Sequence, residues 1–252
     1  SVERFVHSGL GKHDKVDKLE IVWPNGQTLV KTNLAVNQIH EFKSSDANGP
    51  KEDLITQKTP IRDLSDSLFT FIHKEALVND FQSEVLLPHK MSHLGPFISK
   101  GDANGDGLED LYVSGAADFP GIMYIQQPGS GFVEKSGPWT KEKSHEEMDS
   151  EFFDADGDGD LDLYVVSGGN EYNYNAPQTH DQLYINDGKG NFTNETAERL
   201  PRMEGSGQRV ALADYDSDGD MDMYVGGRQM PGYYPYTCRS YLLQNDGKGN
   251  CK

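Results

Sequence analysis

The chain has 252 residues with 23 basic and 41 acidic side chains, and its formal net charge at pH 7 is −18. This length accommodates one or two domains of about 100–200 residues each, and no apolar run approaches the ~18 residues of a membrane-spanning helix. The strong negative charge repels phosphate backbones and anionic lipid surfaces, which excludes nucleic acid as a general partner and argues against direct membrane insertion.

The first 43 residues contain the pattern of a β-hairpin. Residues 16–23 alternate apolar and polar side chains, which is the period of a half-buried strand. Pro, Asn and Gly at 24–26 supply turn chemistry, and residues 27–30 are the returning strand. The polar, aperiodic stretch that follows predicts a linker over residues 44–68. The sequence therefore predicts a small β-rich domain at residues 1–43.

From residue 69 to residue 252, one pattern occurs three times. An acidic loop is followed at once by a short apolar strand, a variable loop, a second strand and a glycine turn. The loops begin at Asp102, Asp154 and Asp214, so the repeating unit is about 50–60 residues long. Repeats of this length built from short strands are typical of β-propellers. We therefore expect an all-β protein, with the small domain followed by part of a propeller.

Each acidic loop carries an aspartate or asparagine at positions 1, 3, 5 and 9 and a glycine at position 6. The alternation points these side chains into one concavity, and the glycine allows the position 7 carbonyl to face inward. An oxygen-only site of about six or seven ligands suits Ca²⁺ better than Mg²⁺, which prefers a tight octahedron and retains waters. The loops are not EF-hands, because position 12 is valine in all three and the flanks are strand-like.

We expect about three calcium ions, one for each loop. The predicted ligands are Asp102, Asn104, Asp106, Leu108 and Asp110 in the first loop, Asp154, Asp156, Asp158, Asp160 and Asp162 in the second, and Asp214, Asp216, Asp218, Asp220 and Asp222 in the third. Position 7 is expected to bind through its carbonyl, and position 9 through both carboxylate oxygens. Because the loops are equivalent parts of three repeats, we expect the ions to be structural and to neutralise local charge.

The residues quoted above resemble two known families. The three loops and the strands after them resemble the FG-GAP/VCBS repeats of integrin α-type and bacterial seven-bladed β-propellers. Residues 1–43 are similar to the ASPIC/UnbV domain in the segments 6–11, 22–26 and 37–38. The combination resembles the secreted cartilage-acidic-protein-like proteins of bacteria. It implies a calcium-binding protein that is secreted or attached to the cell surface and takes part in adhesion-like interactions.

The resemblance also implies that other segments complete the propeller. In that family the ASPIC/UnbV domain usually follows a propeller, whereas here it precedes the repeats. Three strong repeats are too few for a seven-bladed ring, and an open arc exposes strand edges that native proteins avoid. We therefore expect missing propeller segments, or a neighbouring chain, to complete the ring.

Two loops between the paired strands are rich in tyrosine and asparagine. Such surfaces suit stacking on sugars and hydrogen bonding to a protein partner. The alternative, that these aromatic side chains pack blade against blade, stays open. The candidate ligand-binding residues are Tyr172 and Tyr174 in the first of these loops and Tyr233, Tyr234 and Tyr236 in the second.

Outside the acidic loops, the sequence contains little that indicates catalysis. No nucleophile elbow, glycine-rich phosphate loop or zinc-ligand spacing occurs. His73 and Glu75, followed by Asp80, are a possible polar site near the first repeat, but an ordinary surface explains them more simply. We therefore expect the protein not to be an enzyme.

The expected function is that of an extracellular or cell-surface calcium-binding protein acting in adhesion or in binding a glycan or protein. Two alternatives stay open. The first is a calcium-dependent propeller enzyme that acts on polysaccharide, which requires a carboxylate or His/Tyr cluster outside the acidic loops that converges on a pocket. The second is a structural subunit of a surface assembly or filament.

Overall fold

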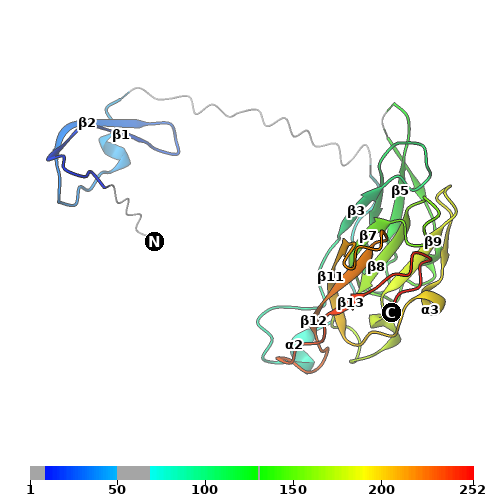
Figure 1. Cartoon of the computed structure of the whole chain (residues 1–252). Helices are drawn as coiled ribbons and strands as arrows, with labels where there is room; N and C mark the ends of the chain where they lie inside the picture. The colour runs from blue at the N-terminus through cyan, green and yellow to red at the C-terminus, as the bar shows by residue number, and fades with distance from the viewer. Residues whose placement is uncertain (1–8, 50–68, 130) are drawn as a thin grey trace. The chain divides into compact units, whose positions relative to one another are not determined.

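The computed structural model describes residues 9–49, 69–129 and 131–252 (Figure 1). The chain divides into two compact units, residues 1–63 and 64–252. Within the described residues, no helix has the length and apolar character needed to cross a membrane. Most of the predicted linker and the first part of the ASPIC/UnbV-like pattern, residues 6–8, lie outside the described residues.

The first unit contains the predicted hairpin. Strand β1 (Lys15–Val22) pairs antiparallel with β2 (Thr28–Ala35), with Val22 opposite Thr28. The turn is closed by backbone hydrogen bonds from Trp23 to Gln27 and from Gly26 to Trp23, both 2.8 Å long. Gly26 has a φ of 80°, a conformation that glycine adopts without steric cost. The turn chemistry read from the sequence is confirmed.

The packed part of the first unit extends beyond the expected boundary at residue 43. A short 3₁₀ helix, η1 (Ser44–Asp46), leads to Asn48, which lies against β2. The Asn48 side chain accepts from the Val30 N–H at 2.9 Å and donates to the Val30 carbonyl at 3.2 Å. The backbone N–H groups of Asn48 and Gly49 donate to the Thr28 carbonyl. These contacts make residues 44–49 part of the hairpin unit.

The second unit consists of three consecutive antiparallel sheets, which we call blades 1, 2 and 3 (Figure 1). In each blade, strands that follow one another in the chain are neighbours in the sheet. Blade 1 contains β3 (Ile98–Gly101), β4 (Asp110–Val113), β5 (Ile122–Gln126) and β6 (Phe132–Lys135); blade 2 contains β7 (Glu147–Phe153), β8 (Asp162–Ser167), β9 (Gln182–Asn186) and β10 (Phe192–Asn194); blade 3 contains β11 (Ser206–Ala213), β12 (Asp222–Gln229) and β13 (Tyr241–Leu243). The expected all-β class is confirmed, and the sheets are propeller-like blades.

Helices are few and short in the described residues. Besides η1 in the first unit, they are α2 (Asp80–Ser83), α3 (Thr196–Arg199), η2 (Pro138–Thr140) and η3 (Pro177–Thr179). Each acidic loop connects the first two strands of its blade, so a strand precedes every loop. The sequence analysis did not identify these first strands.

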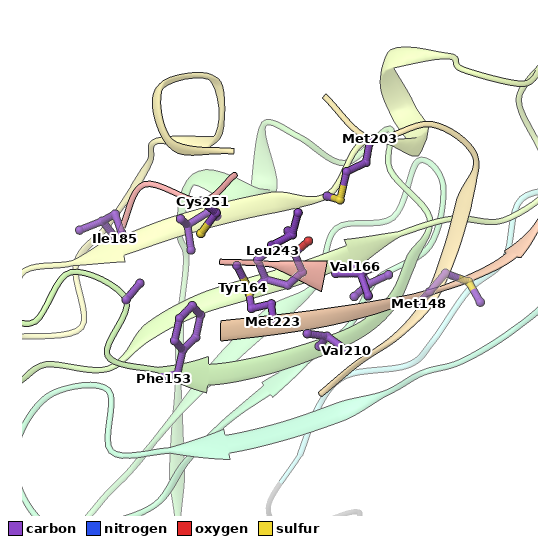
Figure 2. Close-up of a cluster of buried hydrophobic side chains, with 13 residues drawn as sticks. Met148, Phe153, Tyr164, Val166, Ile185, Met203, Val210, Met223, Leu243 and Cys251 are labelled. Carbon is purple, nitrogen blue, oxygen red and sulfur yellow. The ribbon is translucent and has the colours of Figure 1, made fainter. Parts of the chain in front are cut away.

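Apolar side chains fill the space between neighbouring blades. Between blades 1 and 2, the buried Trp139 contacts Tyr112 and Tyr184 edge-on, at ring-centre distances of 5.2 and 5.7 Å. Figure 2 shows the second core, where Tyr164 of blade 2 and Met223 of blade 3 lie among residues from both sheets. Burying these large side chains is the main favourable contribution to holding consecutive blades together.

The outer face of blade 3 differs from the equivalent faces of blades 1 and 2. Strands β4 and β8 each begin with the position 9 aspartate of the acidic loop, and Tyr112 and Tyr164 stand two residues after it. Both tyrosines are fully buried. Tyr224 occupies the same place in β12 and is 52% exposed, and its cross-strand neighbour Leu242 is 42% exposed. Blade 3 therefore presents to the outside a face that the first two blades bury.

Candidate functional site

The last aspartate of each acidic loop, at position 9, begins the second strand of its blade and is buried. In all three blades its carboxylate accepts two backbone hydrogen bonds, one from loop position 2 and one from the end of the third strand. The donors are Ala103 and Gln126 for Asp110 (3.0 and 2.8 Å), Ala155 and Asn186 for Asp162 (2.9 and 2.8 Å), and Tyr215 and Asn245 for Asp222 (2.8 and 2.9 Å). Position 9 thus ties each loop to two strands.

The first aspartate of each loop organises the turn around itself. Asp102 accepts backbone hydrogen bonds from Gly105, Asp106 and Gly107, the last at 2.7 Å. The corresponding donors are Gly157 and Gly159 to Asp154, and Asp218 and Gly219 to Asp214. In every loop the backbone N–H of the position 6 glycine donates to the first aspartate. This glycine has a φ of 85–101°, which explains why the position is glycine.

The second and third loops each bring three carboxylates together. Oxygen atoms of Asp154, Asp156 and Asp162 lie within 4.8 Å of one another in the second loop. A matching group in the third loop consists of Asp214, Asp216 and Asp218. Separations of this size allow three oxygens to contact a single cation at the 2.3–2.6 Å distances typical of Ca²⁺.

One carboxylate oxygen of the second loop is buried and unused. No described residue donates a hydrogen bond to Asp156 Oδ1. Since a buried acceptor without a donor is costly, a cation at this point would satisfy it. The donor set therefore fits Ca²⁺, as the sequence predicts.

The first loop differs at position 3, where it has an amide in place of a carboxylate. Asn104 Nδ2 donates to Asp106 Oδ2 at 3.1 Å, and Asn104 Oδ1 accepts from the Asp106 N–H at 3.0 Å. The amide oxygen remains a suitable calcium ligand. The lower negative charge of this loop distinguishes it from the other two.

Burial makes the position 9 carboxyls of the first two loops harder to ionise. It raises the pKa of Asp162 to about 7, and the charges of Asp156 and Asp158 add to that effect. Burial likewise raises the pKa of Asp110 above its ordinary value. A nearby divalent cation would favour the ionised form. In its absence, protons compensate part of the loop charge.

The position 7 carboxylates of the second and third loops lie against the glycine turn that follows the third strand of the same blade. The Asp220 carboxylate lies against Gly247, where a β-carbon would come within 2.7 Å of Oδ2, and Asp160 lies in the same way against Gly188. Both glycines have positive φ, at 65° and 70°. That the position 7 residue binds calcium through its main-chain carbonyl stays a prediction.

Asparagine side chains connect the loop of one blade to the next blade. Asn186, at the end of β9, donates through Nδ2 to the Ala103 carbonyl at 2.7 Å and to the Leu161 carbonyl at 3.0 Å. Asn245 donates to the Ala155 carbonyl at 2.8 Å. The sequence analysis missed this role, although both residues head the same glycine turn, Asn-Asp-Gly-Lys-Gly-Asn.

The two tyrosine-rich loops meet in the structure. The rings of Tyr174 and Tyr233 contact edge to face at a centre distance of 6.2 Å. Tyr233, Tyr234 and Tyr236 are all exposed, while Tyr172 is partly buried. Together these five tyrosines define what we call the tyrosine surface. It combines exposed aromatic faces with nearby hydrogen-bonding groups, an arrangement that can hold a polar ligand.

A buried polar anchor fixes both tyrosine-rich loops to α2. Asn170 Nδ2 donates to Asp80 Oδ1 at 2.9 Å and to Glu84 Oε2 at 2.8 Å. The Tyr234 N–H donates to Glu84 Oε1 at 2.7 Å. Asp80 is buried because the backbone of Met91 and Ser92 closes over its carboxylate. The simpler expectation of an ordinary surface is therefore wrong for Asp80.

These features define a protein of the β-propeller type whose blades carry oxygen-rich acidic loops. Residues 102–165 and 154–225 each match the FG-GAP-like repeat, and residues 1–49 match ASPIC and UnbV. The chain thus combines an ASPIC/UnbV domain with FG-GAP-like repeats, as its sequence resemblance implies.

Comparison with individual proteins adds a distant structural likeness. No curated protein matches the chain. Among solved structures, one similar chain is an Agrocybe aegerita lectin described as recognising non-reducing terminal N-acetylglucosamine. The likeness has a TM-score of 0.41 and 19% identity, and covers 62% of this chain and 36% of the lectin chain.

Proposed function

We propose that this protein binds Ca²⁺ in its three acidic loops and acts outside the cell as a ligand-binding or adhesion protein, without catalysis. The observation that carries the proposal is that the second and third loops each hold three carboxylates whose oxygen atoms lie within 4.8 Å of one another. The equivalent backbone hydrogen bonds in all three loops support extending the role to the first. FG-GAP-like repeats are typical of extracellular proteins, where millimolar calcium would keep such loops filled.

In the second loop, Asp154, Asp156, Asp158 and Asp162 would hold the ion with the Asp160 carbonyl. The bound ion would neutralise carboxylates that otherwise repel one another. Position 9 would transmit this effect to the sheet, because Asp162 also holds β9 through the Asn186 N–H. Calcium would thus stabilise the blades rather than take part in chemistry.

The tyrosine surface is the proposed ligand site. Its exposed rings offer faces for stacking on a sugar or contacting a protein, and the anchor at Asn170 holds both loops in place. Neither acidic-loop carboxylates nor calcium need take part in this contact. Ligand binding and calcium binding are therefore separable properties of the molecule.

Calorimetric titration of Ca²⁺ into chelator-stripped protein tests the calcium proposal. About three sites are expected for the unaltered chain and one fewer for Asp156→Ala, because that substitution removes both side-chain oxygens at loop position 3, including the unpartnered Oδ1. Asp17→Ala is the matched control, since Asp17 is exposed on β1 in the first unit. A chain that binds no calcium, or whose melting temperature is the same with and without it, would contradict the proposal.

A further inference from the structure

A second group of acidic side chains lies apart from the acidic loops. We call Glu75, Glu146 and Glu171 the polar cluster. Glu146 immediately precedes β7, whereas the second acidic loop follows that strand at Phe153. A seven-residue strand spans about 20 Å, so the polar cluster and the calcium loops lie at opposite ends of blade 2.

Glu146 and Glu171 pack against the same glycine. A β-carbon on Gly169 would lie 2.8 Å from the Glu146 side chain and would collide with Glu171 Oε2. Glu146 is 1% exposed, and its Oε2 accepts from the Ala117 N–H at 2.8 Å. Glu171 Oε2 accepts from the Asn170 N–H at 2.8 Å. The other oxygen of each carboxylate, Oε1, is buried and receives no hydrogen bond from the described residues.

Glu75 brings a third unused oxygen to the polar cluster. His73 Nε2 pairs with Glu75 Oε1 at 2.7 Å, which fixes the carboxylate, and Oε2 is buried with no donor in the described part of the chain. The charges of Glu171 and Glu75 both act on Glu146 and help to raise its pKa, after the larger effect of burial. This mutual influence places the three carboxylates in one electrostatic environment.

One basic side chain, Arg228, interacts through its charge with Glu171 and Glu146 but donates its hydrogen bonds to another residue. The Arg228 guanidinium donates to the Met91 carbonyl at 3.1 Å and to the Met91 sulfur. Gln229 also has an unused acceptor. Its Nε2 donates to Asn170 Oδ1 at 2.9 Å, and its Oε1 is buried without a described donor. Buried acceptors of this kind are normally satisfied by an ion or ordered water.

We propose that the polar cluster binds one hydrated divalent cation, with Glu146 Oε1 and Glu171 Oε1 as its anionic partners and Glu75 as a further source of negative charge. Within the described residues, the acidic triplets close enough to enclose a bare ion are those of the second and third acidic loops. Water must therefore complete the shell at the polar cluster. Mg²⁺ retains several waters when it binds carboxylates, which makes it the first probe.

A cation at this site would help to fix the position of the tyrosine surface. Glu171 is followed directly by Tyr172, and its neighbour Asn170 is the anchor that joins α2 to both tyrosine-rich loops. A cation between Glu146 and Glu171 would relieve their repulsion and hold this segment in position. The proposal does not depend on calcium in the acidic loops.

Equilibrium dialysis with saturating Ca²⁺ and added Mg²⁺ tests the proposal on the unaltered chain. One bound Mg²⁺ beyond the calcium ions is expected. The double variant Glu146→Gln/Glu171→Gln should bind none, while Glu198→Gln, altered at an exposed site on α3, should bind one. Absence of bound Mg²⁺ in the unaltered chain would overturn the proposal even if the double variant failed to fold.

A thermal melt separates a cation site from carboxylates that are merely protonated. At neutral pH without divalent ions, the double variant and the unaltered chain should melt at similar temperatures, because burial raises the pKa of Glu146 to about 9 and the carboxyl stays neutral like the amide that replaces it. Mg²⁺ should raise the melting temperature of the unaltered chain but not that of the double variant. An equal Mg²⁺ response in both would contradict the site, whereas loss of one calcium site in Asp156→Ala would concern only the acidic loops.

Discussion

At the scale of single residues, two buried carboxylates accept hydrogen bonds from the tyrosines that follow the first two acidic loops. Tyr112 Oη donates to Glu147 at 2.9 Å, and Tyr164 Oη donates to Asp181 at 2.6 Å. Burial raises the pKa of both carboxyls to about 7. Each therefore holds a proton in the folded protein at pH values where the unfolded chain has released it.

This difference predicts how stability depends on pH. Between about pH 4.5 and 7 the folded state binds more protons than the unfolded state, so the free energy of unfolding falls as the pH rises. Glu147→Gln removes one titrating group and keeps an acceptor for Tyr112, so its pH profile should be flatter. Urea unfolding in chelator from pH 5 to 8 measures this effect. Parallel profiles for the variant and the unaltered chain would contradict it, and Glu198→Gln should leave the slope unchanged.

The residues of the acidic loops could be predicted because their roles depend on local spacing. Asp154 and Gly159 form their hydrogen bond within one loop, so the pattern is visible in the sequence. Glu146 and Asn186 could not be found in this way. Their partners, Ala117 and Ala103, lie 29 and 83 residues away in the chain. The fold alone brings such groups together.

At the scale of elements, the first strand of each blade was missed because it lacks an apolar pattern. These strands bond to the neighbouring blade through polar groups. Ser99 of β3 and Ser150 of β7 share a hydrogen bond of 2.7 Å between hydroxyls. Asp149 of β7 accepts from the Val210 N–H and from Arg209 of β11, both at 3.1 Å. Polar residues that pair between blades therefore interrupt the alternation that marks an ordinary strand.

The asparagine contacts between blades predict a stability effect. Asn186→Ala should lower the free energy of unfolding by about 1–3 kcal/mol, because it leaves the buried Ala103 carbonyl and the half-buried Leu161 carbonyl without this donor. It should also weaken calcium binding, since both carbonyls belong to acidic loops. Asn173→Ala, at an exposed position, is the control. Urea unfolding with and without calcium measures both effects, and a change below that of the control would refute the role.

The tyrosine surface predicts a loss of binding without a loss of fold. Tyr233→Ala and Tyr236→Ala should each reduce binding to any glycan or protein ligand at least tenfold, while the melting temperature stays unchanged because both side chains are exposed. Tyr215→Ala is the matched control, since Tyr215 is an exposed tyrosine of the third acidic loop. A glycan array followed by titration of any ligand found provides the measurement. Equal binding by all three variants would remove the surface from consideration.

At the scale of the whole molecule, the net charge of −18 predicts a dependence on salt. Without calcium, repulsion among the loop carboxylates destabilises the blades, and salt screens that repulsion because the Debye length falls to about 3 Å at 1 M. Raising the NaCl concentration should therefore increase the melting temperature in chelator more than it does in calcium. Differential scanning fluorimetry over a salt series measures this difference. Equal salt responses in both conditions would contradict it.

The blade architecture could be predicted from the repeats, but the way the array is completed could not. The buried faces of Tyr112 and Tyr164 show how consecutive blades pack, and Tyr224 and Leu242 mark the face where a further sheet would pack. That other segments or a neighbouring chain complete a ring stays a prediction. Long-range contacts of this kind leave no local signal beyond the repeat itself.

The asparagine contacts also give the row of loops a direction. Asn186 of blade 2 holds the first loop, and Asn245 of blade 3 holds the second, so each loop is braced by the blade that follows it. The glycine turn of one blade is therefore part of the support of the loop in the blade before it. If the loops bind calcium as proposed, a change in one blade should consequently alter the calcium affinity of the preceding loop, and the influence should pass along the row in that direction only.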